Sequence, residues 1–307
     1  MKFKTRKILI ICLIATLAIS MISAVSAATI SPTTPGGLEK AIDDAENGDT
    51  INLKNGVYTI NKFVLIEKNI KIIGGSNVVF NSKGKGGISI IHYLQKPTVT
   101  LEKIKFKNFK KIAIYADEQT KLTVKNCVFT NNQCEYNGAA ISSSGSLTIS
   151  KCIFTNNQAI FGGAINSHNL LINDCTFTNN QAKFLGGAID ADKLTIKNCI
   201  FNSNKGESAG SIYAKDLIIS DCTFTNNKAS SAGGAIFSDK MSMKKCTFTN
   251  NQAKFNGGAI ILLGKSKMRT ITDSKFNKNI AGKKYNAIDG KATLKNVKIS
   301  PKDGIKV

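Results

Sequence analysis

The side chains with the clearest chemical potential are carboxylates, an imidazole and an amine at regular intervals. Asp192 follows His168 by 24 residues and precedes Lys215 by 23. Asp190 lies two residues before Asp192, and Asp239 follows Lys215 by another 24. Several carboxylates around one hard cation such as Ca²⁺, with a basic residue beside them, would suit metal-assisted proton abstraction. Stacked opposite charges are more typical of surface pairs worth under about 1 kcal/mol each. We therefore assign no catalytic, cofactor-binding or metal-binding residue here, and we expect no cofactor.

The overall composition limits other chemistry. The chain has 307 residues, 42 Lys and Arg against 20 Asp and Glu, a formal net charge of +22 and two histidines. Two histidines leave little room for a histidine-based metal site or a catalytic triad. The basic residues are not interleaved with aromatic ones, so we expect no nucleic acid partner. The positive charge favours anionic glycans or cell-surface polymers, bound in a salt-dependent way, or serves solubility alone.

The first residues are typical of a targeting segment. Four basic residues precede an apolar stretch from Ile8 to Ile22, and small residues follow it up to Val25-Ser26-Ala27. This pattern predicts a secretory signal peptide over residues 1–27, although an uncleaved anchor would also fit its apolar length. After cleavage we expect a secreted or cell-surface chain of 280 residues with a charge of +18, seven cysteines and no membrane span.

The rest of the chain is a repeat of about 24 residues. Phenylalanine recurs at steps of 23 to 28, cysteine stands two positions before six of these, and asparagine stands three positions after seven. Gly-Gly-Ala-Ile or a close variant follows about eight residues later. The positions are Phe106, Phe129, Phe154, Phe177, Phe201, Phe224, Phe248 and Phe276; Cys127, Cys152, Cys175, Cys199, Cys222 and Cys246; and Asn132, Asn157, Asn180, Asn204, Asn227, Asn251 and Asn279.

Within each repeat the apolar residues alternate and do not follow helical spacing. Leu147, Ile149 and Phe154 point one way, with one extra residue that marks a bend. Alternation over short runs between Asn and Gly turns predicts strands. A period near 24 without helices predicts a parallel β-helix whose coils lie about 4.8 Å apart. About eleven coils between Ile51 and Ile299, two of them irregular, would form a rod about 50 Å long.

Stacked coils give each column of like residues a physical role. The phenylalanines would fill the interior as stacked rings, and the asparagine amides would hydrogen-bond along the stack. The glycine pair would supply a backbone position that a Cβ would obstruct. The cysteines alternate with the inward phenylalanines, so we expect reduced, buried thiols. Pairing of some cysteines, or metal binding, remains open.

The two ends of the rod need cover because an open β-helix exposes unpaired strand edges. Leu38, Ala41, Ile42 and Ala45 follow helical spacing, which predicts a short amphipathic helix in an N-terminal cap over residues 28–50. The sequence shows no comparable cap before Val307. We expect that end to be covered by another chain through self-association, to be covered by surface material, or to be covered poorly.

Three resemblances accompany these patterns. The joint recurrence of Gly-Gly-Ala-Ile and Phe-x-x-Asn resembles the repeats of chlamydial polymorphic outer-membrane proteins. The form Cys-Thr-Phe-Thr-Asn-Asn behind a signal peptide more closely resembles the adhesin-like proteins of methanogenic archaea. Residues 38–58, which include Asn-Gly-Asp-Thr-Ile-Asn-Leu and Gly-Val-Tyr, are similar to the start of pectate-lyase-like β-helices. The resemblance implies an all-β fold with one right-handed parallel β-helix over residues 51–307.

That fold also occurs in polysaccharide lyases and hydrolases, whose motifs test for an active site. The hydrolases resemble one another in Asn-Thr-Asp, Asp-Asp and Gly-His-Gly, and this chain has only Asp43-Asp44, in the predicted cap helix. We therefore predict that the chain is not an enzyme. We expect a secreted or cell-surface adhesin-like protein that attaches to anionic polysaccharide, wall polymer or other cells. The alternative is a carbohydrate-active enzyme, either a polysaccharide lyase or a glycoside hydrolase, on the same fold.

Overall fold

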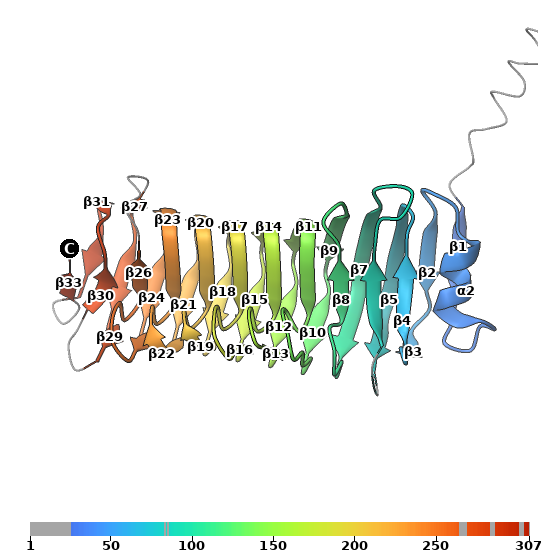
Figure 1. Cartoon of the computed structure of the whole chain (residues 1–307), viewed down its shortest axis with the longest axis horizontal. Coiled ribbons are helices and arrows are strands. Elements are labelled where there is room, and N and C mark those ends of the chain that lie inside the picture. The colour runs from blue at the N-terminus through green and yellow to red at the C-terminus, as the bar shows by residue number, and fades with distance from the viewer. Residues whose placement is uncertain are drawn as a thin grey trace, which may run out of the picture.

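The computed structural model describes residues 26–82, 84, 86–263, 269–282, 286–300 and 304–306. Residues 1–25 of the predicted signal peptide lie outside the described residues, as does Val307. Within these residues the strands stack along one axis into a rod, with helix α2 (Gly37–Asp44) at the N-terminal end (Figure 1). All strand pairings are parallel, so the predicted parallel β-helix of about eleven turns is confirmed.

A regular turn contains a long strand, a strand of three residues and a short outer strand. The long strand bends at an exposed corner, where its ladder is interrupted between two paired segments, and each strand pairs with its equivalent in the next turn. The long strands are β11 (Ile141–Ser150), β14 (Ile165–Asn173), β17 (Ile189–Lys197), β20 (Ile212–Ser220) and β23 (Ile236–Lys244); the three-residue strands are β10 (Val128–Thr130), β12 (Ile153–Thr155), β15 (Thr176–Thr178), β18 (Ile200–Asn202), β21 (Thr223–Thr225), β24 (Thr247–Thr249) and β28 (Lys275–Asn277); the outer strands are β13 (Gln158–Ala159), β16 (Gln181–Ala182), β19 (Lys205–Ser208), β22 (Lys228–Ala232), β25 (Gln252–Ala253) and β29 (Ile280–Ala281).

The turns at both ends are less regular but continue the same parallel ladders. They comprise β1 (Ala27–Ile30), β2 (Thr50–Leu53), β3 (Gly56–Thr59), β4 (Phe63–Ile66), β5 (Ile70–Asn81), β6 (Gly87–Ile90), β7 (Thr98–Lys107), β8 (Ile114–Ala116) and β9 (Lys121–Lys125) before β10, and β26 (Ile260–Leu262), β27 (Arg269–Thr272), β30 (Asn286–Asp289), β31 (Thr293–Lys295), β32 (Lys298–Ile299) and β33 (Gly304–Lys306) towards the C-terminus. Strand β1 already pairs with β2, so the first ladder begins within the segment predicted as a cap.

The phenylalanine column is buried and stacked, as predicted. From Phe106 to Phe276 consecutive ring centroids are 4.7–4.8 Å apart and the ring planes lie within 4° of parallel. The column extends to Phe80, whose ring meets Phe106 edge to face. The ring spacing equals the spacing of neighbouring strands, so each turn adds one ring to a continuous core.

The asparagine column forms the predicted amide ladder. In the middle of it, the Asn180 Nδ2 donates to Asn204 Oδ1 at 3.0 Å and to the Phe154 carbonyl at 3.0 Å. The Asn180 backbone N–H donates to the same Asn204 Oδ1 at 2.9 Å. Asn132 through Asn279 are fully buried at this position. Each buried amide is therefore satisfied by the turns on both sides, which ties the turns into one register.

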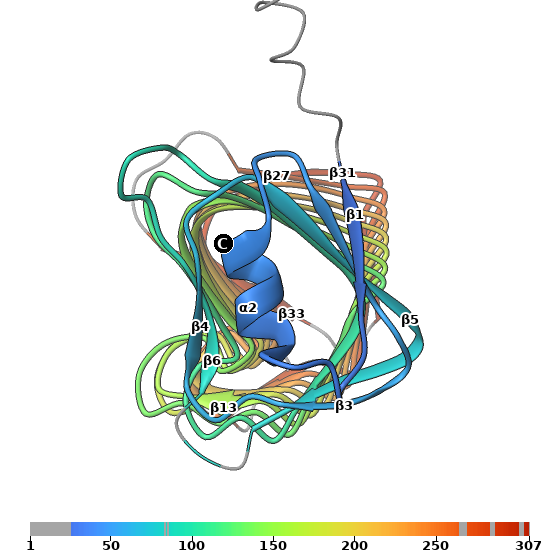
Figure 2. The same cartoon turned by 90° about the vertical axis from the view of Figure 1, so that its right-hand side faces the viewer.

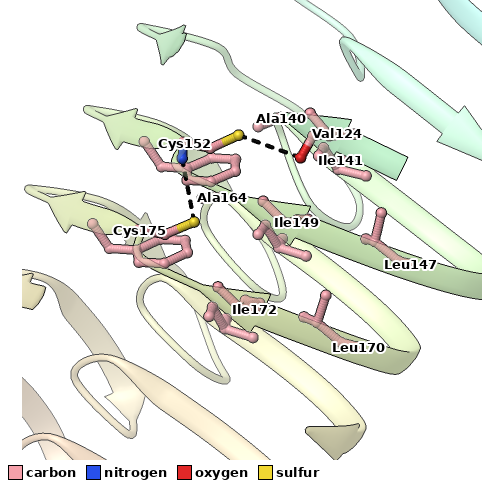
Figure 3. Close-up of a cluster of buried hydrophobic side chains, with 14 of the residues drawn as sticks. Val124, Ala140, Ile141, Leu147, Ile149, Cys152, Ala164, Leu170, Ile172 and Cys175 are labelled. Carbon is pink, nitrogen blue, oxygen red and sulfur yellow. Dashed lines mark hydrogen bonds between the residues drawn. The ribbon is translucent and has the colours of Figure 1, made fainter. Parts of the chain in front are cut away.

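The cysteine column is buried, and the sulfurs of Cys152 and Cys175 in neighbouring turns point the same way (Figure 3). The Cys152 backbone N–H donates to Cys175 Sγ at 3.3 Å, and the Cys152 thiol donates to the Val124 carbonyl at 3.6 Å. Hydrogen bonding to Cys199 and burial raise the pKa of Cys222 to about 12. The Cys222 thiol therefore stays neutral near pH 7, and it packs as a small buried core residue.

The glycine pair has the steric role that was predicted. The first glycine takes a left-handed conformation, with φ of +60° at Gly186. A Cβ on the second, Gly187, would lie 2.1 Å from the Gly210 carbonyl oxygen in the next turn. The chain therefore turns sharply before each long strand, and neighbouring turns approach closely there.

The helix α2 lies across the N-terminal end of the stack (Figure 2). Its Leu38 and Ile42 side chains are buried and belong to the core cluster that runs through the rod, while Ala41 and Ala45 pack against that cluster. The predicted short helix is thus present, and its apolar face covers core side chains of the first turns.

Candidate functional site

The strand register brings polar side chains of three successive turns together at one corner. Asn166 of β14, Asp190 of β17 and Tyr213 of β20 are partners in the ladder. Two residues further along each strand is the bend, where His168, Asp192 and Lys215 lie between two paired segments. We call the group the corner cluster: Asn166, His168, Asp190, Asp192, Tyr213 and Lys215.

The structure brings together most of the residues that the sequence singled out. Lys215 Nζ lies 2.6 Å from Asp192 Oδ1, and His168 Nε2 lies 3.8 Å from Asp192 Oδ2. Within the described part of the chain, Lys215 pairs with Asp192 and not with Asp239, one turn further along. The next column contains a similar pair, in which Lys240 Nζ lies 3.1 Å from Asp216 Oδ1.

Asp190 differs from Asp192 in its surroundings. The pKa of Asp190 is raised to about 6, mainly by burial. The hydrogen bond from Asn166 and the charge of Lys215 oppose this rise, and the charge of Asp192 contributes to it. The Asn166 Nδ2 donates to Asp190 Oδ2 at 2.9 Å. Asp192 instead meets two basic side chains at the exposed corner. Two carboxylates on one strand are thus held in unlike environments, which is how proteins separate an acid from a base.

Aromatic rings continue the column that contains Asp190. Tyr213 and Phe237 are ladder partners, and their ring centroids are 5.1 Å apart with planes at 29°. Burial raises the pKa of Tyr213 above its usual value, and the charge of Asp239 adds to this effect. The apolar faces of pyranose rings stack on such side chains, and binding sites combine apolar rings with a few polar groups.

Sequence reasoning missed Asn166 and Tyr213, although both stand one repeat from Asp190. It also missed a pair at the same corner nearer the N-terminus. His92 Nδ1 lies 2.5 Å from Asp117 Oδ2, and Gln119 Nε2 lies 3.1 Å from His92 Nε2. Ala116 pairs with Ser143, and Ser143 pairs with Ser167 in the next turn. Asp117 and His168 therefore occupy the same position in their turns. Aligning repeats position by position, and not searching for local motifs, would have found these residues.

No metal or membrane site is evident in the described residues. They include no group of three or more His, Cys, Asp and Glu side chains placed to hold a metal ion. Among the same residues, no helix is long and apolar enough to cross a membrane. The corner cluster itself presents two carboxylates, an imidazole, a phenol and an amine.

The family is shown by the sequence match. Residues 86–244 and 187–299 match the family described as the right handed beta helix region. The chain belongs to this family, and the predicted right-handed sense of the solenoid is confirmed. A search of curated proteins found no match. The finer resemblances to archaeal adhesin-like proteins and to chlamydial repeats stay predictions.

Solved structures share the fold at low identity. ORF18 of Geobacillus virus E2 is 15% identical with a TM-score of 0.52; the match covers 89% of this chain and 60% of the viral protein. A mannuronic acid specific polysaccharide family 6 lyase from human gut microbiota is 12% identical with a TM-score of 0.52, over 90% of this chain and 83% of the lyase. Pectin methylesterase PemA from Erwinia chrysanthemi is 13% identical with a TM-score of 0.48, over 81% of this chain and 93% of the esterase.

The likeness to the lyase corrects one prediction. We predicted that the chain is not an enzyme because three hydrolase motifs are missing from their expected places. That prediction is wrong, since a polysaccharide-cleaving enzyme has the same fold at 12% identity. The physical reason is that facing side chains on a solenoid come from separate turns, as Asp192 and Lys215 do, so a site need not form a contiguous motif. The likeness itself establishes only the fold.

Proposed function

We propose that this chain is a carbohydrate-active enzyme that hydrolyses glycosidic bonds of an acidic polysaccharide at the corner cluster. The observation that carries the proposal is the pair Asp190 and Asp192, two residues apart on β17 in unlike surroundings. Glycoside hydrolysis uses one carboxylic acid with a raised pKa and one carboxylate. Asp190, with a pKa of about 6, suits the acid, and the ion-paired Asp192 suits the carboxylate.

The reaction can be written for these two groups and water. Asp190 donates its proton to the glycosidic oxygen as the bond from that oxygen to the anomeric carbon breaks. Water adds to the anomeric carbon, and its proton passes to Asp192.

The remaining side chains support an acidic, extended substrate. Lys215 and His168 place basic groups beside the carboxylates, and the chain as a whole has an excess of positive charge. The rings of Tyr213 and Phe237 offer apolar surface for a sugar unit next to Asp190. An extracellular location follows from the predicted signal peptide and belongs to the same proposal.

Incubation of the purified protein with a panel of polyuronates, followed by assays for new reducing ends and for unsaturated ends, tests the proposal. We expect reducing ends without unsaturation. Asp190→Asn and Asp192→Asn should each lower the rate at least about 100-fold, because each removes one proton-transfer group. Asp216→Asn is the matched control, since Asp216 is an ion-paired corner carboxylate in the next column. It should keep most of the activity.

Three results would contradict this function. Binding of polyuronates without any turnover would remove the catalytic role. Full turnover by both Asp190→Asn and Asp192→Asn would place the chemistry elsewhere. Products with unsaturated ends would replace hydrolysis by elimination, the lyase reaction, at the same cluster.

A further inference from the structure

A groove crosses the outer strands β16, β19 and β22, on the side of each turn that precedes the corner cluster. It has a volume of about 510 Å³. Residues 183–188 connect β16 to β17, so the groove and Asp190 lie on neighbouring sides of the rod. We call it the lysine groove; the side chains that matter here are Gln158, Gln181, Lys183, Lys205, Glu207 and Lys228.

The groove is lined by three lysines and one carboxylate, Glu207, so its net charge is positive. In the described part of the chain, none of Lys183, Lys205 and Lys228 has a carboxylate within ion-pair distance, whereas Lys215 and Lys240 each have one. Lys205 and Lys228 are ladder partners, so their backbones lie about 4.8 Å apart. Their ammonium groups carry like charge on neighbouring turns, and an anion that contacts both would offset the repulsion between them.

The same column continues with uncharged hydrogen-bonding groups. Gln158 pairs in register with Gln181, and Gln181 with Lys205. Glutamine amides suit sugar hydroxyls, and lysines suit sugar carboxylates or sulfates. One step along the rod is comparable with the length of one unit in an extended pyranose chain. The described lining residues include no aromatic side chain, and the neighbouring Phe184 ring lies under Lys183 Nζ, which is 5.1 Å from the ring centroid. The groove therefore lacks the row of aromatic side chains on which successive bases of single-stranded nucleic acid stack.

We propose that the lysine groove binds a polyanionic glycan that lies along the rod, separately from the corner cluster. The site holds an extended chain of carboxylate-bearing sugars by its charged groups and hydroxyls. Its existence does not depend on the hydrolysis proposed for Asp190 and Asp192.

The test uses a double variant, Lys205→Gln with Lys228→Gln, in the full-length protein. Glutamine occupies the same column at Gln158, Gln181 and Gln252, so the fold accepts it there. Fluorescence anisotropy with a labelled oligogalacturonate measures binding, in an Asp190→Asn background so that the probe is not consumed. We expect Kd to rise about tenfold at low salt. Lys197→Gln with Lys244→Gln, which removes equal charge at exposed positions outside the groove, should change Kd less than about twofold.

Each outcome decides the proposal. Unchanged affinity in the groove variant, equal loss in the control variant, or tighter binding of a single-stranded oligonucleotide than of the glycan would overturn it. Turnover of a short oligosaccharide by the groove variant in an otherwise native background should stay normal. A negative result for glycan binding in the groove can therefore be distinguished from a negative result for catalysis at the corner cluster.

Discussion

At the scale of the residue, burial separates two chemically identical side chains. Asp190 and Asp192 share one strand; burial raises the pKa of Asp190 to about 6, whereas Asp192 meets Lys215 and His168 at the exposed corner. Asn166 opposes that rise because its amide donates to the ionised carboxylate. The balance between burial and this hydrogen bond therefore sets the protonation state on which the proposed acid depends.

The pH dependence of polyuronate cleavage follows from this balance. An acid must be protonated to act, so kcat/KM should fall as the pH rises past about 6. Asn166→Ala removes a hydrogen bond that favours the charged form, so the fall should move to higher pH. Asn173→Ala, at the far end of the same strand, is the control and should leave the profile in place. A profile that Asn166→Ala leaves unshifted would count against Asp190 as the acid.

At the scale of the element, each turn is stabilised by the columns of side chains that it shares with the neighbouring turns. The asparagine ladder satisfies buried amides in both directions, and the phenylalanine stack fills the space beneath them. The short strands have few backbone partners of their own, so these side-chain columns contribute much of the specificity of the register.

Removing one ring from the middle of the stack should be costly. Phe201 is fully buried between Phe177 and Phe224, so Phe201→Ala should lower the free energy of unfolding by about 3 to 5 kcal/mol. Phe255→Ala is the matched control because that ring is 58% exposed, and it should cost no more than about 0.5 kcal/mol. Chemical denaturation followed by circular dichroism measures both. Equal losses in the two variants would contradict an energetic role for the stack.

At the scale of the whole molecule, the rod is a one-dimensional array in which each turn contacts only its neighbours. Stability in such arrays is close to a sum of local terms, so the ends open more easily than the middle. Helix α2 covers one end with Leu38 and Ile42. Self-association through the other end stays a prediction.

Helix α2 gives a prediction whose effect can be located along the rod by hydrogen exchange. Ile42→Asp buries a carboxylate where 2% of the isoleucine is exposed, and should destabilise the first turns by about 2 to 4 kcal/mol. Hydrogen exchange should then speed up in β1, β2 and β4, while β14 to β23 stay protected. Asp43→Asn, on the exposed side of the same helix, should leave exchange unchanged. Uniform loss of protection along the rod would show that the turns unfold as one unit.

The sequence by itself determined the solenoid, its period and the inward columns. Repeated phenylalanine, asparagine and glycine positions such as Phe201, Asn204 and Gly187 each have one physical role that recurs in every turn. Only the tertiary structure decided the site. The depth of Asp190, the hydrogen bond from Asn166 and the choice of Asp192 as partner of Lys215 depend on side chains one turn away. The period says which turns are neighbours, but the space and charge around a side chain arise only when those neighbours are packed.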